Sequence, residues 1–268
     1  MRKPSGSISD LFSWKEAGMV NILLAGIPVQ FDNRFADLER LCRGFEINLP
    51  PKLSIQVSGE ELEEERSKQA GVFSDGYLET VCCYRKAATA LLDWDVFVMH
   101  GSVVELDGEG YAFLAPSGVG KTTQTRLWQQ HFGHRLRVIN GDKPLIRMVY
   151  DGESVRFDAY GTPWRGKEGL GCNSSVPLKA IFFLNQSNTP SAVPADPAQM
   201  VEPLFRQLLL PKESGRMLRL LNMADKMVGT VSFYMLNCDM TEQSVLCAYR
   251  VVNRPSCQRS KSEKGRFG

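Results

Sequence analysis

One segment constrains the fold of this chain more than any other: residues 115–122 read APSGVGKT. A strand-like run, YAFL, precedes it, and a helix-like run, TTQTRLWQQHFG, overlaps its end. Between a strand and a helix, successive backbone N–H groups can face a phosphate, and the helix N-terminus adds a favourable dipole. The strict pattern asks for glycine where Ala115 stands, but a negative φ at a strand exit tolerates one methyl group. The segment therefore predicts a phosphate-binding loop.

The residue types in this loop have separate tasks. Gly118 and Gly120 let the backbone bend tightly and approach a ligand. Lys121 can reach the outer phosphates of a nucleotide, and the Thr122 hydroxyl can bind magnesium. A glycine-rich turn with a surface lysine is the simpler alternative, but the Gly-Lys-Thr order and the flanking elements favour the phosphate loop. We expect the nucleotide to be held by Ser117, Gly118, Val119, Gly120, Lys121, Thr122 and Thr123.

Phosphoryl transfer also needs a carboxylate, because Mg²⁺ prefers oxygen ligands and the attacking hydroxyl must lose a proton. Asp142 follows the apolar run VIN, 21 positions after Lys121, so one helix and one returning strand can bring it beside the loop. The alternative is a plain turn, since the residues of NGDKP favour turns. We expect Asp142 to ligate magnesium together with Thr122 and to accept or orient the proton of the acceptor hydroxyl.

The remaining patterns predict an α/β fold with a mixed, hairpin-rich central sheet and flanking helices. The sequences DGEG at residues 107–110 and Asp-Gly at 151–152 are tight-turn signals between strand-like runs, and such turns join antiparallel strands. In this part of the chain we expect strands at 96–106, 111–115, 135–140, 176–185 and 231–236, a hairpin around 151–152, and helices at 122–133, 195–210 and 216–228.

The N-terminal part predicts a smaller set of elements. These are a strand or hairpin at 20–31, a short helix at 33–42 capped by Asn33, a strand at 53–59, a solvated helix or linker at 60–71, and an amphipathic helix at 76–95. The charged stretch at 60–71 marks a soft boundary. We therefore divide the chain into an N-terminal α/β region of unknown role (1–75), a nucleotide-binding domain (76–252) and a flexible basic tail (253–268).

Composition gives no sign of a nucleic-acid or membrane partner and indicates a compartment for the protein. The 32 Lys and Arg residues nearly balance the 30 Asp and Glu residues, so the overall charge does not indicate a nucleic-acid or membrane surface. The chain contains no apolar run long enough to span a bilayer and no evident export signal. Seven cysteines without a C-x-x-C pair favour a reduced, cytoplasmic compartment. The Leu and Met stripe at 208–227 is interpreted as core or as a subunit contact, which leaves a homo-oligomer open.

The order of these motifs resembles a known family. HGSVVELDGEGYAFLAPSGVGKT followed by HRLRVINGD is similar to the core of the bacterial HPr kinase/phosphorylases, whose superfamily includes the ATP-dependent phosphoenolpyruvate carboxykinases. The resemblance covers about residues 96–184. It implies a phosphate-loop fold like that of the C-terminal domain of HPr kinase, with ATP and Mg²⁺ as cofactors.

Carried over residue by residue, the resemblance implies that Lys121 and Thr122 hold the nucleotide phosphates and the metal, and that His100 lies near the site. The family has two adjacent aspartates after the strand, whereas here Gly141 replaces the first. Asp158 is a candidate for the missing carboxylate. The cations of the loop around Trp164, Arg165 and Lys167 can clamp phosphate charge or bind an acidic substrate, unless the loop is merely solvated.

These expectations lead to a kinase that transfers a phosphoryl group to a hydroxyl of a protein serine, a peptide or a small molecule. Its catalytic residues are expected to be Asp142, His100 and Lys121. The alternative is a catalytically silent nucleotide-binding regulator, which can dispense with a base, and the loss of the first aspartate suits that alternative. A carboxykinase-type enzyme needs more metal ligands than a chain with three histidines offers.

Overall fold

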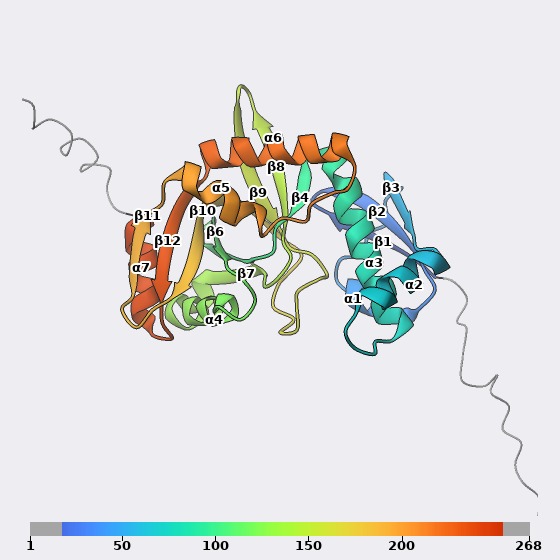
Figure 1. The fold of residues 1–268 in the computed structure, drawn as a ribbon, viewed down its shortest axis with the longest axis horizontal. Helices are drawn as coiled ribbons and strands as arrows, with labels where there is room; N and C mark the ends of the chain where they lie inside the picture. Colours follow the sequence, from blue (N-terminus) through green and yellow to red (C-terminus); the bar gives the residue numbers. More distant parts are fainter. Residues whose placement is uncertain (1–17, 254–268) are drawn as a thin grey trace, which may run out of the picture.

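The computed structural model describes residues 18–253, which form two β-sheets with flanking helices (Figure 1). The strands are β1 (Gly18–Leu24), β2 (Ile27–Asn33), β3 (Leu53–Gln56), β4 (Val96–Val98), β5 (Ser102–Leu106), β6 (Glu109–Leu114), β7 (Leu136–Asn140), β8 (Leu145–Asp151), β9 (Ser154–Tyr160), β10 (Ser175–Gln186), β11 (Ser191–Pro194) and β12 (Ser232–Cys238). The helices are α1 (Ala36–Cys42), α2 (Gly59–Lys68), α3 (Asp75–Ala90), α4 (Lys121–Phe132), α5 (Pro197–Phe205), α6 (Ser214–Thr230) and α7 (Glu242–Val252), with short 3-10 turns η2 (Leu91–Trp94) and η3 (Gly133–Arg135).

The larger sheet is mixed, as the turn signals predict. Its order is β4-β8-β9-β10-β6-β5-β7, with β12 beside β10 and β11 beside β12. The Asp-Gly turns close the antiparallel hairpins β5–β6 and β8–β9, whereas β10 pairs in parallel with both β6 and β12. The mixed α/β class and the hairpin-built sheet are therefore confirmed.

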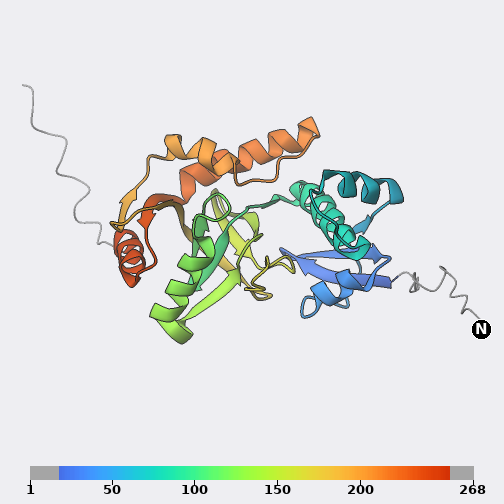
Figure 2. The ribbon, with the colours of Figure 1, turned by 60° about the horizontal axis from the view of Figure 1, so that its bottom comes forward.

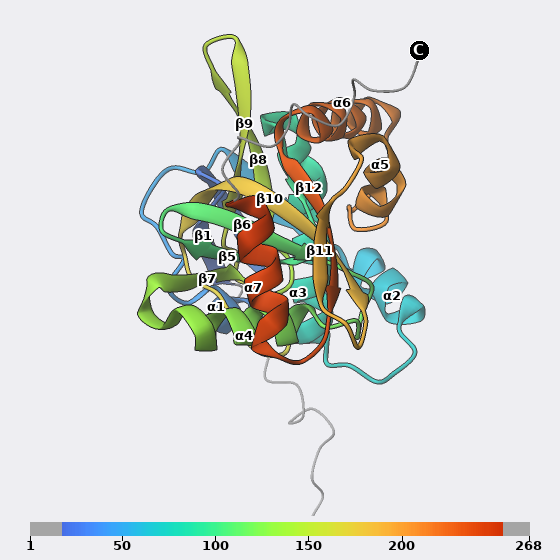
Figure 3. The same cartoon turned by 90° about the vertical axis from the view of Figure 1, so that its left-hand side faces the viewer.

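Successive side chains of β6 and β10 point to opposite faces of the larger sheet, and each face belongs to a different hydrophobic core. Tyr111 and Phe113 of β6 face the core that contains Trp128 of α4 and the buried side of α7, while Ala112 and Leu114 face α5 and α6. Trp128 is fully buried, with its ring 5.2 Å from that of Tyr111 and 5.3 Å from that of Phe113. Figure 3 shows α4 and α7 on one side of the sheet and α5 and α6 on the other. This packing fixes the direction in which α4 leaves β6.

The Leu and Met stripe at 208–227 is partly core. Leu220, Met223 and Met227 of α6 are buried against the larger sheet. On the opposite side of the helix Leu218 is 70% exposed. Leu210 and Leu221 are also exposed, so burial against the sheet accounts for only part of the apolar stripe.

The smaller sheet belongs to an N-terminal unit that we define as residues 18–75 together with α3. β1 and β2 form a hairpin, β3 adds in parallel to β2, and α3 packs against α1, α2 and β3 (Figure 2). Ala25 and Gly26 make the turn with positive φ values of 49° and 78°. The core of this unit also includes Val98 and Leu145 of the larger sheet, so the two sheets are joined by shared packing. The proposed division at residue 75 stays a prediction.

The predicted cap of the first helix is wrong. α1 begins at Ala36, after Phe35, because β2 continues through Asn33. The Asn33 amide donates to the Phe35 carbonyl oxygen at 3.0 Å instead of capping the helix. The carboxylate of Glu79 on α3 accepts the N–H groups of Arg34 and Phe35 at 2.9 and 3.1 Å, so a long-range contact replaces the expected local one.

Other elements agree with the sequence in kind but differ in extent. The charged segment at 60–71 is the helix α2, and its Glu65 is buried in a pair with Arg85 at 2.6 Å. α5 ends at Phe205 and contains Pro203, which has no N–H, but helical bonding continues past this proline, because the Arg206 N–H donates to the Glu202 carbonyl oxygen at 3.2 Å. β11 and α7 were not predicted. From residue 254 onward, the predicted tail lies outside the described residues.

Helices that could span a membrane are absent from the described part of the chain. None of its helices is both long enough and apolar enough to cross a bilayer.

Candidate functional site

The predicted phosphate loop connects β6 to α4, as its flanking sequence requires. Gly118 and Gly120 have φ values of +83° and +123°, which L-residues with a side chain rarely adopt. A Cβ atom at either position would meet nothing within 4 Å, so open space lies beside both residues. Ala115 is buried and is not among the described residues with positive φ, which explains why alanine fits there. The loop therefore turns at two glycines whose positive φ values and open surroundings agree with the tight bend that the sequence predicts.

Lys121 begins α4 and folds back over the loop. Its Nζ donates to the carbonyl oxygens of Ala115 at 2.7 Å and Pro116 at 3.3 Å. Burial lowers the pKa of Lys121, whereas the negative charge of Asp142 acts in the opposite direction. Lysine and aspartate thus lie within electrostatic reach of each other.

The other residues expected to bind nucleotide surround this lysine. Ser117 and Gly118 are exposed, and Val119, Gly120, Thr122 and Thr123 are half-buried at the start of α4. One turn further into the helix, the Thr125 hydroxyl is 3.0 Å from the Ser102 hydroxyl and anchors the helix to β5. The helix N-terminus is therefore held against the sheet while the loop before it stays accessible.

Asp142 lies just after β7, next to His100. Its Oδ1 is 3.4 Å from His100 Nε2, and its Oδ2 accepts from Lys143 Nζ at 2.7 Å. Burial raises the pKa of Asp142, but the hydrogen bonds and charges of His100 and Lys143 lower it, and the net value is about 2. Asp142 is therefore ionised at neutral pH and surrounded by positive or potentially positive groups.

His100 reaches this position because the strand predicted at 96–106 is broken. β4 pairs with β8 and β5 pairs with β6, so the chain crosses between two parts of the sheet at residues 99–101. The N–H of Gly101 donates to the Asp142 carbonyl oxygen at 3.0 Å. A Cβ on Gly101 would lie 2.3 Å from Leu114 Cδ2, so glycine is needed at the crossing.

Two buried amides that the sequence analysis did not single out hold this arrangement. The N–H of His100 donates to the backbone oxygen of Gln207 at 2.7 Å. In the amide orientation that suits its neighbours, the Gln207 side chain donates to the carbonyl oxygens of Ala115 and His100, both at 3.3 Å. Asn140, fully buried at the end of β7, accepts the Asp142 N–H at 2.9 Å. In the sequence, the one sign that Asn140 holds the Asp142 turn is its position directly before Gly141-Asp142.

A loop that we name the site loop, residues 161–172, covers the end of β7. The N–H of Gly141 donates to the Leu170 carbonyl oxygen at 2.9 Å. A Cβ on Gly141 would lie 3.2 Å from both the Cβ and the carbonyl oxygen of Leu170, and a Cβ on Gly166 would lie 2.9 Å from Asp142 Cβ. The site loop thus leaves little room for a side chain at position 141, where the HPr kinases that the sequence resembles have an aspartate.

The cations of the site loop have different surroundings. Arg165 donates to the Gly171 carbonyl oxygen at 3.3 Å, and its guanidinium lies 6.0 Å from the centre of the Phe45 ring. Lys167 is exposed, and within residues 18–253 its ammonium has no hydrogen-bond or ion-pair partner. Glu168 pairs with Arg126 of α4, which links the loop to the helix. Lys167 is the cation of this loop that is free to meet an anion.

Asp158 does not join the site. Its carboxylate accepts from Arg156 Nε at 3.0 Å, and the strand register places it opposite Arg147 of β8. Because Asp142 precedes the start of β8 and Arg147 lies within it, the register separates the two carboxylates along the strand. The expectation that Asp158 supplies a second carboxylate beside Asp142 finds no support in this geometry.

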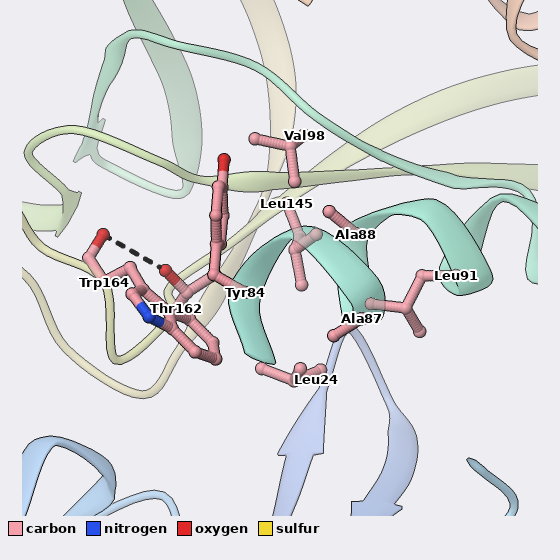
Figure 4. Close-up of a pocket in the computed structure, with 9 residues that line it drawn as sticks. All are labelled: Leu24, Tyr84, Ala87, Ala88, Leu91, Val98, Leu145, Thr162 and Trp164. Atoms are coloured by element: carbon pink, nitrogen blue, oxygen red, sulfur yellow. Dashed lines mark hydrogen bonds between the residues drawn. The ribbon is translucent and has the colours of Figure 1, made fainter. Parts of the chain in front are cut away.

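A small apolar hollow lies beside the site loop rather than at the phosphate loop. Figure 4 shows its lining, in which the rings of Tyr84 and Trp164 lie next to each other. The lining residues are Leu24, Tyr84, Ala87, Ala88, Leu91, Val98, Leu145, Thr162 and Trp164. Because it sits where the N-terminal unit meets the larger sheet, we interpret it as a packing gap between them.

Comparison with curated proteins gives no match. Among solved structures, the chain is similar to the Hpr(Ser) kinase/phosphatase from Coxiella burnetii, with 7% sequence identity and a TM-score of 0.30. The similarity covers 57% of this chain and 96% of that one. A TM-score this low supports no conclusion about fold or function, so the likeness to HPr kinases rests on the motifs above.

A family model gives a clearer result. The model described as SynChlorMet cassette protein ScmC matches residues 80–244, which include the phosphate loop, Asp142 and the site loop. The matched region covers more than half of the chain. The chain therefore belongs to the ScmC family of SynChlorMet cassette proteins.

Proposed function

We propose that this protein is an ATP-dependent kinase that transfers a phosphoryl group to a hydroxyl of a protein serine, a peptide or a small molecule. One observation carries the proposal: the glycine loop, Lys121 and Asp142 meet at one edge of the sheet, where β6 and β7 end. Asp142 is close enough for its charge to oppose the effect of burial on the Lys121 pKa. A phosphate-binding loop with a charged carboxylate beside it is what phosphoryl transfer requires.

ATP fits the loop on two counts. The space beside Gly118 and Gly120 is open, and Ser117 and Gly118, which carry backbone N–H groups, are exposed. Among the described residues Lys121 Nζ bonds only to loop carbonyl oxygens, and it can turn to phosphate oxygens with little change in its main chain. The nucleotide is thus expected to rest on residues Ser117, Gly118, Val119, Gly120, Lys121, Thr122 and Thr123.

Magnesium also fits, provided that the nucleotide supplies some of its ligands. In the described residues no cluster of three or more His, Cys, Asp or Glu side chains could hold a metal by itself. Mg²⁺ sites of this kind use one or two protein groups plus substrate phosphates and water. Thr122 and Asp142 are the protein groups in question. When bound, the ion neutralises charge on the phosphates.

The catalytic roles of Asp142 and His100 concern the acceptor hydroxyl, whereas that of Lys121 concerns the transferred phosphoryl group. Asp142, with a pKa of about 2, is a weak proton acceptor and a permanent negative charge, which suits it to orienting the acceptor hydroxyl. His100, half-exposed and 3.4 Å from this carboxylate, holds Asp142 in place and faces the same space. Lys121 stabilises negative charge on the transferred group.

A regulator that binds nucleotide without transferring phosphate is the second candidate, and one observation favours it. Gly141 stands where the resembling kinases have an aspartate, and the site loop fills the space of its side chain. Such a regulator keeps nucleotide binding but lacks turnover. Measurement of nucleotide turnover therefore separates the two candidates.

The test is incubation of the full chain with γ-labelled ATP, Mg²⁺ and a cell extract, followed by identification of the labelled molecule. The proposal predicts a labelled acceptor with wild-type protein and none with Lys121→Ala. Equal labelling with the Lys121→Ala variant would assign the activity to the extract. Nucleotide binding without any labelled acceptor would favour the regulator.

A further inference from the structure

The side chain of Asn140 lies between two turns of the site. On one side its Oδ1 accepts the N–H groups of Asp142 at 2.9 Å and Lys143 at 2.7 Å. These bonds fix the backbone of the turn that carries the Asp142 carboxylate. Because Asn140 is fully buried, water cannot replace either bond.

On its other side, Asn140 is bound to the site loop. Its Nδ2 donates to Thr162 Oγ1 at 2.9 Å and to the Thr162 carbonyl oxygen at 3.3 Å. Thr162, itself only 1% exposed, donates through Oγ1 to the Lys143 carbonyl oxygen at 2.9 Å. Asn140, Thr162 and the 142–143 turn thus form a closed, buried ring of hydrogen bonds.

The N-terminal unit supports this ring through Trp164. Its indole Nε1 donates to the Thr80 carbonyl oxygen of α3 at 3.1 Å, and its ring lies 5.4 Å from that of Tyr84 and 6.1 Å from that of Phe31. Figure 4 shows Trp164 and Thr162 joined by a hydrogen bond beside Tyr84. A continuous set of contacts therefore runs from the N-terminal sheet to the Asp142 turn.

We propose that Asn140 and Thr162 are positioning residues for Asp142, and that through them the site loop and the N-terminal unit set the rate of phosphoryl transfer without contacting the nucleotide. This inference rests on the proposed function. In a fully satisfied buried network, removal of one partner leaves the others unpaired, so the turn has to move. A shift of about 1 Å in a reacting group can lower a rate by about a hundredfold.

A matched pair of substitutions at Thr162 tests this. Thr162→Val keeps the shape but removes the hydroxyl, whereas Thr162→Ser keeps the hydroxyl and removes only a methyl group. Two readouts are compared with wild type in the full chain. The first is amide hydrogen exchange at Asp142 and Lys143, followed by NMR. The second is single-turnover loss of the γ-phosphoryl group from Mg–ATP to water, measured with the Mg–ATP Kd.

For Thr162→Val we expect exchange at both amides to rise about five- to tenfold, as the loss of about one hydrogen bond predicts. Transfer should fall at least about tenfold while the Kd stays within about twofold, because the phosphate loop is untouched. Thr162→Ser should resemble wild type in all three measurements. This pattern distinguishes positioning from a general loss of stability, which would also raise the Kd.

The inference is overturned if Thr162→Val leaves exchange at both amides unchanged, or if exchange rises while transfer stays at the wild-type rate. It is also overturned if Kd and transfer change together. Failure of the proposed function is distinct: wild-type protein would then bind Mg–ATP without transferring the γ-phosphoryl group to water or to any acceptor in a cell extract. The amide exchange of the two variants would in that case decide whether Thr162 positions the Asp142 turn.

Discussion

His100 Nε2 lies 3.4 Å from Asp142 Oδ1. His100 lies in the break between β4 and β5, and Asp142 lies in the break between β7 and β8. The breaks are joined by backbone hydrogen bonds, because the N–H groups of Met99 and Gly101 donate to the carbonyl oxygens of Pro144 and Asp142. The pair is therefore fixed by main chain as well as by side chains. Substitutions at Asp142 can accordingly change its charge without dismantling the turn.

Asp142→Asn should lower phosphoryl transfer by about a hundredfold or more, because the acceptor hydroxyl loses the charged group that orients it, while nucleotide affinity largely survives. Asparagine keeps the shape of the side chain but removes its charge. Single-turnover transfer and a nucleotide titration measure the two effects. Asp158→Asn is the control and should keep near-normal transfer, since its carboxylate faces Arg156. If Asp158→Asn loses transfer and Asp142→Asn keeps it, Asp158 is the carboxylate that orients the acceptor hydroxyl.

Mg–ATP should stabilise the wild-type chain against heat, because a ligand that binds only the native state shifts the unfolding equilibrium. At about 100 times the Kd the gain is about 2.7 kcal/mol, or roughly 5–10 °C for a chain of this size. Lys121→Ala should reduce this shift. Lys52→Ala, which removes an exposed lysine of the N-terminal unit, should retain it. An equal shift in both variants would argue against the phosphate loop.

The Asp142 carboxylate should make stability depend on pH in the acid range. Its pKa falls from an ordinary value of 3.8 to about 2 in the folded chain, so its contribution is full above about pH 4 and is lost as the pH falls through about 2. That shift corresponds to roughly 2 kcal/mol. Urea unfolding of wild type and Asp142→Asn between about pH 2 and 6 should show a difference that narrows on acidification. A difference independent of pH would exclude this role for the carboxylate.

Gly141→Ala should destabilise the fold by about 1–3 kcal/mol, because the new Cβ would lie 3.2 Å from Leu170 Cβ and the Leu170 carbonyl oxygen. Thermal unfolding measures the change. The matched control is Gly229→Ala in α6, where a Cβ meets nothing within 4 Å and alanine favours the helix. The control should be neutral or stabilising. Equal stability of the two variants would mean that the site loop does not pack on Gly141.

Local patterns in the sequence predicted much of this fold. The Asp-Gly turns identified both hairpins, and the run from YAFL through the glycine loop into TTQTRLW identified β6, the loop and α4. These features depend on neighbouring residues only. The presence of Lys121, Asp142 and His100 in one place was also predicted, the last from the family resemblance.

What the sequence did not reveal depends on contacts between distant segments. Glu79 binds the start of α1 from another helix, so the rule that favours an Asn cap failed at Asn33. Gln207 lies just after the C-terminal end of α5 and links the phosphate loop to His100, and nothing in the neighbouring sequence indicates that role. Asp158 looked like a site residue because it ends a strand-like run, but the register of β8 and β9 places it opposite Arg147, and its carboxylate accepts from Arg156 on the same strand.

Phosphoryl transfer by this chain can be tested by comparing ATP labelled at the γ-phosphorus with ATP labelled at the α-phosphorus. Each is incubated with Mg²⁺, a cell extract and either the wild-type chain or Asp142→Asn. We expect the acceptor to receive label from the γ position alone, and only with the wild-type chain. Label from the α position, or no labelled acceptor from a wild-type chain that binds ATP, would contradict it.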